Sequence, residues 1–302
     1  MAAARGPVRR LVGHRRRRAD AARPRLRRRR GAALSSPLRI ATLNLASGRG
    51  ADSTHLPPSE VAAALSALDA DVVSLQEVDV DQPRSGSVDQ AGLAAASLGA
   101  ADWRFAPALV GTPGLVRSWT PSPPVALREA DGVARFGVAL LSRRPVRRWE
   151  VLSLGSGRFA LPLRVPDPRT GRVRTFWFPD EPRVALAAVL DGVTIVATHL
   201  SFAPPTSWRQ LKALRQWAAA LPGPVVLAGD LNLPGAVAAR RAGGRALAKA
   251  PTYPGAGPRV QLDHVLALGS TTQGSSSVRS SGASARRLAV GDHRALTVDV
   301  HL

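Results

Sequence analysis

The 302-residue chain contains no cysteine, one methionine and one tyrosine. Without cysteine it can form neither a disulfide framework nor a cysteine-ligated zinc or iron–sulfur site. No apolar run reaches the roughly 18–20 residues that a membrane-spanning helix needs. Hydrophobic residues make up 45% of the chain, and the prolines and glycines are spread along it. This composition excludes fibrous and low-complexity proteins and leaves a core for one large domain or two small ones.

Acidic residues are also scarce, since 21 Asp and Glu stand against 42 Lys and Arg, a formal net charge of +21. Residues 1–36 hold 13 of the basic residues and one acid, which leaves a net charge of +9 for residues 37–302. Runs of like charge cannot bury enough surface to offset their ordering entropy. We therefore expect an Arg-rich, disordered tail over 1–36 and a single domain over 37–302. The tail binds polyanions, is a solvated extension without a role, or is not translated because the true start lies nearer Leu38.

Short apolar runs interleave with helical patterns after residue 37, and tight turns join several neighbouring runs. This order of elements favours two packed mixed or antiparallel sheets with helices outside them, rather than a regular parallel sheet. The Asp191-Gly192 pair predicts a hairpin, and the proline-bearing segments 111–132 and 155–172 are expected to be surface loops. Helices are predicted over 59–70, 88–98 and 206–221, and strands over 38–45, 71–76, 136–141, 146–154, 173–178, 184–190, 193–198, 225–228, 261–268 and 295–302.

Polar side chains gather where these apolar runs end. A carboxylate or imidazole in that place is costly unless it is paired or binds a metal. One such residue would usually be an ordinary hydrogen-bond partner, but six groups at strand ends indicate a shared site. They are Asn44, Gln76-Glu77, His199, Asp230 with Asn232, Asp263-His264 and Asp292-His293; of these, His264 is expected to be structural.

Seven segments that contain these residues resemble the endonuclease/exonuclease/phosphatase superfamily, in the family's order and approximate spacing. The resemblance covers roughly residues 37–302 and implies an α/β (α+β) fold. That fold is the deoxyribonuclease-like four-layer sandwich, two packed mixed or antiparallel β-sheets flanked by helices. The matched segments are residues 40–44 (IATLN), 73–77 (VSLQE), 137–143 (GVALLSR), 196–200 (VATHL), 227–232 (LAGDLN), 262–264 (LDH) and 291–293 (GDH).

The resemblance implies a metal site and metal-dependent phosphoester hydrolysis. Glu77 looks like the principal ligand of a Mg²⁺ ion, for which Mn²⁺ could substitute, with Asn44 and Asp292 as further direct or water-mediated ligands. Mg²⁺ prefers hard oxygen ligands and keeps several waters, so these residue types suit it and the absence of cysteine costs nothing. An imidazolium and a metal can together neutralise the charge that develops on a phosphodiester under attack.

The same resemblance implies catalytic roles. Asp230 is similar to the residue that orients and deprotonates the attacking water, and Asn232 to its partner. His293 resembles the imidazole that faces the phosphate and is held by Asp263, because a carboxylate beside an imidazole fixes its tautomer and raises its basicity. His199 matches a second family histidine near the leaving group.

Departures from the family's patterns bear on the substrate. The abasic-site branch has a lysine two residues after the glutamate, where this chain has Asp79, and a tyrosine before the first histidine, whereas the only tyrosine here is Tyr253. Both differences argue against a repair enzyme. Gly291 replaces a serine usual in the family, which puts one local hydrogen bond in doubt. Four arginines could bind a phosphate through two hydrogen bonds: Arg49, Arg84, Arg158 and Arg183. For each of them alone, a solvated side chain is the simpler interpretation.

Three functions follow for testing. The first is a Mg²⁺-dependent nuclease of low sequence specificity, favoured by the basic balance. The second is a phosphatase or phosphodiesterase acting on a small or lipid-linked phosphate, as in sphingomyelinases or inositol phosphatases. The third is a silent binding protein, against which the complete set of site residues argues. We expect a cytoplasmic protein without an obligate protein partner, and six tryptophans that pack in the core or in loops rather than serve as base-stacking platforms.

Overall fold

The computed structural model describes residues 36–302, apart from 115–116, 159, 167–169 and 270–277. Almost all of the predicted tail over 1–36 therefore lies outside the described residues. Among the residues described, no helix is long and apolar enough to cross a membrane.

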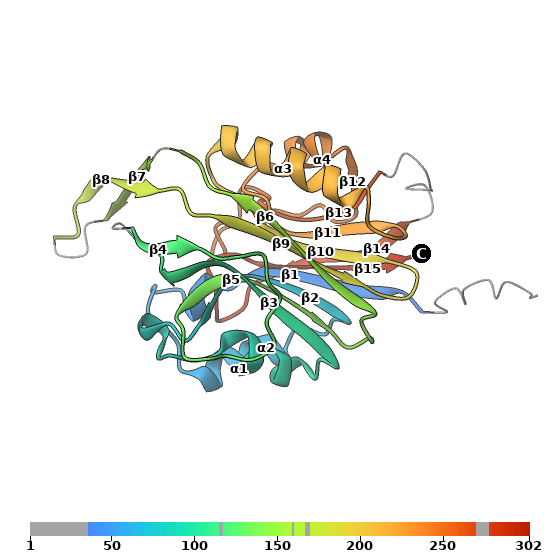
Figure 1. Ribbon diagram of the computed structural model, residues 1–302, viewed down its shortest axis with the longest axis horizontal. Coiled ribbons are helices and arrows are strands. Elements are labelled where there is room, and N and C mark those ends of the chain that lie inside the picture. Colours follow the sequence, from blue (N-terminus) through green and yellow to red (C-terminus); the bar gives the residue numbers. More distant parts are fainter. Residues whose placement is uncertain (1–35, 115–116, 159, 167–169, 270–277) are drawn as a thin grey trace, which may run out of the picture. The chain divides into compact units, whose positions relative to one another are not determined.

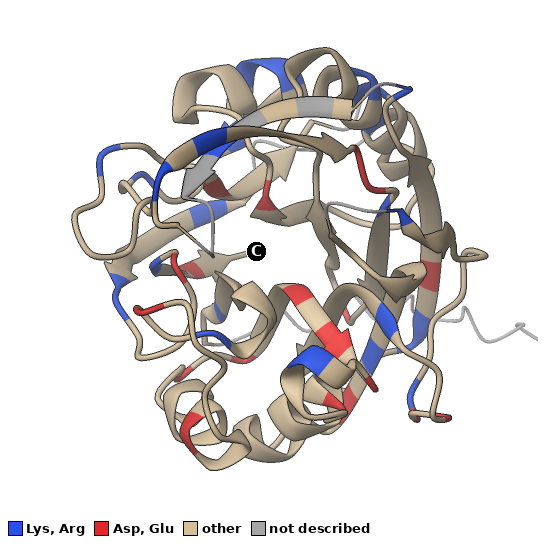
Figure 2. Cartoon of the chain, turned by 90° about the vertical axis from the view of Figure 1, so that its left-hand side faces the viewer, with Lys and Arg blue, Asp and Glu red and all other residues tan. Residues whose placement is uncertain are grey.

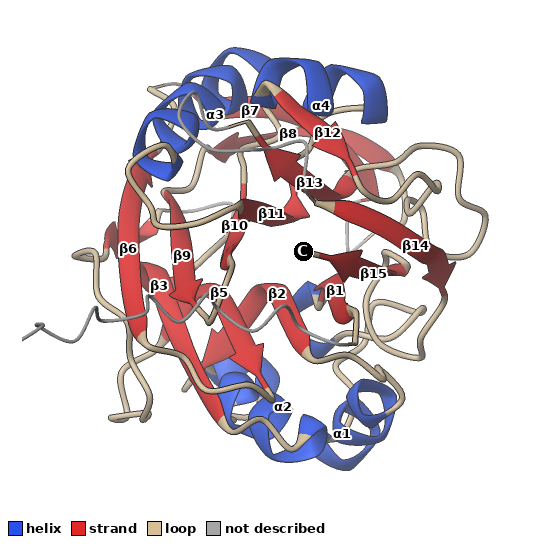
Figure 3. Ribbon diagram, turned by 90° about the vertical axis from the view of Figure 1, so that its right-hand side faces the viewer, coloured by secondary structure: helices blue, strands red, loops and turns tan. Residues whose placement is uncertain are grey.

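Two mixed sheets lie face to face (Figure 1, Figure 3). In each, one pair of strands is parallel, β1 with β2 and β10 with β11, and the other pairs are antiparallel. The seven-stranded sheet has the order β14 (Arg279–Arg286), β15 (Ala295–His301), β1 (Leu38–Asn44), β2 (Val72–Val80), β5 (Arg135–Ser142), β3 (Asp102–Thr112) and β4 (Ser118–Pro121). The six-stranded sheet has the order β12 (Gly244–Ala246), β13 (Asp263–Leu268), β11 (Val225–Asp230), β10 (Thr194–His199), β9 (Arg183–Val189) and β6 (Arg148–Gly155).

Helices cover the outer face of each sheet, which completes four layers and confirms the predicted fold class (Figure 3). The pair α1 (Pro58–Ser66) and α2 (Gln90–Leu98) lies on the seven-stranded sheet, and the pair α3 (Pro204–Ala218) and α4 (Gly235–Ala242) on the six-stranded sheet. Single 3₁₀ turns are η1 (Ala46–Gly48) and η2 (Pro83–Ser85).

The core follows the alternation of side chains along each strand. In β1, Ile40 faces the other sheet, where it packs in one cluster with Ile195 and Val226. The next residue, Ala41, belongs instead to the cluster beneath α1 and α2, together with Leu43 and Leu65. Both faces of the central strands are therefore buried, which is why they read as nearly continuous apolar runs.

Three expectations need correction. Gln76 and Glu77 do not close β2, which continues to Val80 because a bulge at Glu77 interrupts the pairing without ending it. The segment expected to be a loop over 111–132 contains β4, and the segment over 155–172 contains β7 (Ala160–Pro166). β7 pairs with β8 (Val173–Pro179) in a two-stranded sheet.

Candidate active site

Strand register in the six-stranded sheet aligns three of the predicted site residues in one row. His199, the last residue of β10, lies opposite Asp230, the last residue of β11, and Asp230 lies opposite Asp263, the first residue of β13. Gly229 permits this close pairing, because a Cβ there would overlap the backbone carbonyl of Thr198. The row lies at the end of the sheet where the buried strands terminate.

Asn44 links this row to the seven-stranded sheet. Its Nδ2 donates to Glu77 Oε1 at 3.0 Å and to Asp230 Oδ2 at 3.2 Å, across 186 positions of sequence. Glu77 has a left-handed backbone with φ of 52° at the bulge in β2. Such strain in a residue other than glycine persists only where its surroundings impose it, and it turns the Glu77 side chain toward Asn44. Gly291, with φ of 82°, approaches the Asn44 carbonyl so closely that a Cβ would lie 2.5 Å from its oxygen.

His293 and Asp263 form a buried pair. Nδ1 of His293 lies 2.7 Å from Asp263 Oδ2, and both side chains are at least 94% buried. Burial alone would favour the neutral ring, but the charge and hydrogen bond of Asp263, with smaller effects of Asp230 and Asp292, outweigh it and raise the pKa of His293 to about 10. His293 is therefore an imidazolium at neutral pH, and its Nε2 faces Asp230 Oδ2 at 3.9 Å.

Asp230 is fully enclosed at the centre of the cluster. Burial and the nearby charge of Asp263 raise its pKa to about 7, although His293 and hydrogen bonds from Asn232 and Asn44 act in the opposite direction. The backbone N–H of Asn232 donates to Asp230 Oδ1 at 2.9 Å and fixes the carboxylate orientation. A carboxylate with a pKa near the working pH is suited to accept a proton from water.

His199 differs from His293 in its partner. Nη1 of Arg183 lies 3.0 Å from His199 Nδ1. A guanidinium only donates, so Nδ1 accepts and the ring proton is on Nε2, which faces Asp230 Oδ2 at 3.5 Å. The amide Nδ2 of Asn232 also lies 3.1 Å from Nε2, but it donates to the Leu200 carbonyl at 2.9 Å. Burial first, and then the charge of Arg183, hold the pKa of His199 well below its usual value. His199 is thus a neutral hydrogen-bond donor in the cluster.

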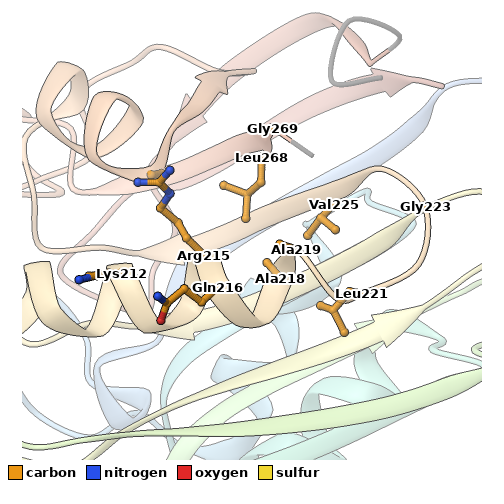
Figure 4. A pocket seen from close by; sticks show the side chains of 11 residues that line it. Lys212, Arg215, Gln216, Ala218, Ala219, Leu221, Gly223, Val225, Leu268 and Gly269 are labelled. Atoms are coloured by element: carbon orange, nitrogen blue, oxygen red, sulfur yellow. The ribbon is translucent and has the colours of Figure 1, made fainter. Parts of the chain in front are cut away.

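A cavity of 540 Å³ opens above these side chains. Figure 2 views the molecule from the side on which β4, β7 and β8 appear in Figure 1, and both acidic and basic segments are seen there. Of the eight predicted site residues, all except Asp263 line this cavity: Asn44, Glu77, His199, Asp230, Asn232, Asp292 and His293. Another cavity, of 330 Å³ beside Lys212, Arg215 and Leu268, is lined by none of them (Figure 4).

Two further residues at the cavity escaped the sequence analysis. The ring of Tyr253 lies 4.8 Å from that of His293, and burial, with the charges of Asp292, Asp230 and Glu77, raises the pKa of its phenol. Glu181 lies 3.6 Å from Arg183, and burial raises its pKa. No neighbouring motif marks either residue, and only the fold brings them to the site.

Arginines line the same cavity, with different partners. Arg49 lies 3.8 Å from Glu77, whereas Arg84 binds Asp79 through Nε at 2.9 Å and Nη2 at 2.7 Å. Asp79 is fully buried, so this ion pair explains an acid at the position where the abasic-site branch has lysine. Arg183 also lines the cavity, while Arg158 is exposed and does not.

The oxygen donors at this site fit a divalent cation. Glu77 and Asp292 offer carboxylate oxygens to one cavity, which is the chemistry that Mg²⁺ prefers. Asn44 also lines the cavity, and its amide oxygen, which accepts one hydrogen bond from the Ala46 N–H at 3.0 Å, keeps a second lone pair. Asp230, Asp263 and His293 also present ligand atoms within 4.8 Å of one another. In that second set, however, Asp263 and His293 already bind each other. We therefore keep Glu77, Asn44 and Asp292 as the predicted ligands.

A model of the Endonuclease/Exonuclease/phosphatase family matches residues 41–293 of the chain. No curated protein matches this chain. Among solved structures, endonuclease/exonuclease/phosphatase from Beutenbergia cavernae DSM 12333 superposes with a TM-score of 0.60 and 21% identity, covering 88% of this chain and 72% of that one. Sphingomyelinase C from Streptomyces griseocarneus gives 0.50 and 18%, covering 87% and 99%. Beta toxin from Staphylococcus aureus, a mutant with bound magnesium ions, gives 0.52 and 13%, also covering 87% and 99%. At these identities the superpositions show a shared fold.

Proposed function

Because the chain belongs to the endonuclease/exonuclease/phosphatase family, and is therefore a hydrolase of phosphoester bonds, we propose that it cleaves phosphodiester bonds in DNA or RNA with little sequence preference and with the aid of Mg²⁺. The observation that carries the proposal is the enclosure of Asp230 among Asn44, His199, Asn232 and His293 in one cavity. Its nucleic-acid substrate is supported by the +9 charge of residues 37–302 and by the arginines at the cavity.

Each side chain has a task in this proposal. Asp230, held by the Asn232 N–H and by Asn44, accepts a proton from water, which its pKa of about 7 allows near neutrality. His293, kept charged by Asp263, faces the negative phosphate. His199 faces the Asp230 carboxylate with its Nε2, at 3.5 Å from Oδ2, and donates its ring proton on that side. A Mg²⁺ ion held by Glu77, Asn44 and Asp292 would neutralise negative charge on the phosphate.

A second candidate is a phosphatase or phosphodiesterase on a small or lipid-linked phosphate. It is favoured by the walls of the cavity, where Phe178, Phe202 and Tyr253 add apolar surface to the arginines. Apolar walls around a few polar groups are typical of pockets that enclose small molecules.

Two substrates separate these candidates. Purified protein would be incubated with supercoiled DNA and with bis-p-nitrophenyl phosphate, each with Mg²⁺ and with EDTA. We expect Mg²⁺-dependent cleavage of both, and a loss of roughly 10²–10⁴-fold in Asp230→Asn, because general-base catalysis contributes about that much. Asp191→Asn, at an exposed turn, is the matched control. Cleavage of the small diester alone would favour the second candidate, and cleavage of neither would contradict both.

A further inference from the structure

The hairpin β7–β8 is a two-stranded sheet that extends beyond the two large sheets (Figure 1). A two-stranded hairpin on its own is marginally stable in water. Apolar side chains exposed on such a hairpin are therefore candidates for contact with a partner. Trp177 in β8 is 64% exposed, more than any other large hydrophobic side chain of the described residues, and Val173 is 57% exposed.

Register shows which residues share the exposed face. Trp177 lies opposite Pro162, and Thr175 lies opposite Arg164. Because side chains alternate along a strand, all four lie on one face of the hairpin. All four residues are exposed, and Arg164 is the diagonal neighbour of Trp177. This face therefore presents an indole beside a guanidinium.

Charge around the hairpin is strongly of one sign. Residues 156–179 contain one acid, Asp167, and five basic residues, which are Arg158, Arg164, Arg169, Arg172 and Arg174. An aromatic surface in a basic setting is complementary to a polyanion that carries flat rings.

The face continues into the active-site cavity. Pro179 follows Trp177 by two residues and lies on the same face of the strand, and it lines the cavity with Phe178. Two residues of strand span about 7 Å, which is roughly two base steps of 3.4 Å. A polynucleotide whose scissile phosphate lies in the cavity would reach Trp177 within a few nucleotides.

We propose that Trp177 and Arg164 form a subsite that stacks a base of single-stranded nucleic acid about two to four nucleotides from the scissile phosphate. The proposal rests on the nuclease function above and adds a substrate class, single strands longer than a dinucleotide. Stacking on an aromatic ring tolerates every base, which agrees with low sequence specificity. It gives Trp177 a role other than the packing that we expected for the tryptophans.

A lipid surface fits this face less well. Membrane anchoring needs a broad apolar area, whereas the pair Arg164 and Thr175 lies between the apolar pair of Trp177 and Pro162 and the exposed Val173. The other aromatic residues of β8, Phe176 and Phe178, are only partly exposed.

Length dependence tests the subsite. Binding of fluorescein-labelled dT12 and of the dinucleotide TpT would be measured in EDTA and in the Asp230→Asn background, where cleavage is expected to be slowed roughly 10²–10⁴-fold. We expect Trp177→Ala to weaken dT12 binding about 5- to 100-fold, since stacking is worth roughly 1–3 kcal/mol per base, and to leave TpT binding unchanged. Trp177→Phe should restore part of the affinity, and Arg164→Gln should lower the salt dependence.

Controls separate this inference from the proposed function. Trp208→Ala, on α3 and 41% exposed beneath Arg241, should not change dT12 binding. Hydrolysis of bis-p-nitrophenyl phosphate, measured with Asp230 intact, should be equal in wild type and Trp177→Ala. Equal dT12 binding with and without the Trp177→Ala substitution would overturn the subsite. Binding to anionic phosphatidylserine vesicles that depends on Trp177, without binding to dT12, would overturn it as well. If the wild-type protein did not hydrolyse bis-p-nitrophenyl phosphate at all, that result would instead contradict the proposed function.

Discussion

Replacing Asp263 by Asn removes the charge that holds His293 in its cationic form. Asp263 is fully buried and His293 is 5% exposed, with 2.7 Å between Oδ2 and Nδ1. The rise in the pKa of His293 from 6.5 to about 10 corresponds to roughly 5 kcal/mol in favour of the charged ring. Breaking a buried ion pair by removing one partner typically costs about 3–5 kcal/mol. We expect a loss of unfolding free energy of that size at pH 6.

The effect should depend on pH with a definite sign. The folded-state pKa of His293 lies above its unfolded value, so the stabilisation is fully present below pH 6.5 and is lost as the pH rises to about 10. The difference in unfolding free energy between wild type and Asp263→Asn should therefore shrink steadily between pH 6.5 and 10.

Urea unfolding at pH 6, 8 and 10 measures this difference, with Asp69→Asn as the control. The Asp69 side chain is 80% exposed and pairs with Arg39 and Arg143, so its loss should cost only about 0–1 kcal/mol. A difference for Asp263→Asn that stays constant over this range would refute the reasoning. If the variant does not fold, NMR titration of His293 in the wild-type protein tests the same reasoning. A titration midpoint near 6.5 would also refute it.

Three further predictions concern neighbouring residues. Because the pKa of Asp230 is about 7, kcat/KM for bis-p-nitrophenyl phosphate should rise as the pH passes upward through about 7, and a pH-independent rate would exclude Asp230 as the base. Gly229→Ala should lose roughly 1–3 kcal/mol or more in urea unfolding, since its Cβ would meet the rigid carbonyl of Thr198. Arg183→Gln removes the guanidinium charge that lies beside Nδ1 of His199, so NMR titration should show a raised pKa for the His199 ring. An unchanged pKa would mean that Arg183 does not lower it.

Hydrophobic patterning predicted most strands that are buried on both faces, because those runs have few polar interruptions. It missed β3, in which residues 105–109 are buried but Pro107 interrupts the run. It failed for β7, where Pro162 and Pro166 lie within the strand and the exposed hairpin contributes little to the core. α4 was also missed, since Gly235–Ala242 is short and its buried side chains are only the small Ala238 and Ala242.

Family motifs identified the residues that share the cavity, but not how they contact one another. The bulge that turns Glu77 depends on pairing between β2 and β5, which local sequence does not record. The contact of Arg183 with His199 likewise arises from the β9–β10 hairpin, not from a motif. Pairing of His293 with Asp263 was predicted from the resemblance, and the structure places the two atoms within hydrogen-bond distance.

The Mg²⁺ dependence of hydrolysis tests the central claim most directly. The rate on bis-p-nitrophenyl phosphate would be measured against Mg²⁺ concentration for wild type, Glu77→Gln and the control Glu150→Gln, whose carboxylate pairs with Arg148 in β6. If Glu77 holds the ion, its variant should need at least about tenfold more Mg²⁺ for half-maximal rate, while the control matches wild type. An unchanged Mg²⁺ requirement in Glu77→Gln would contradict the account.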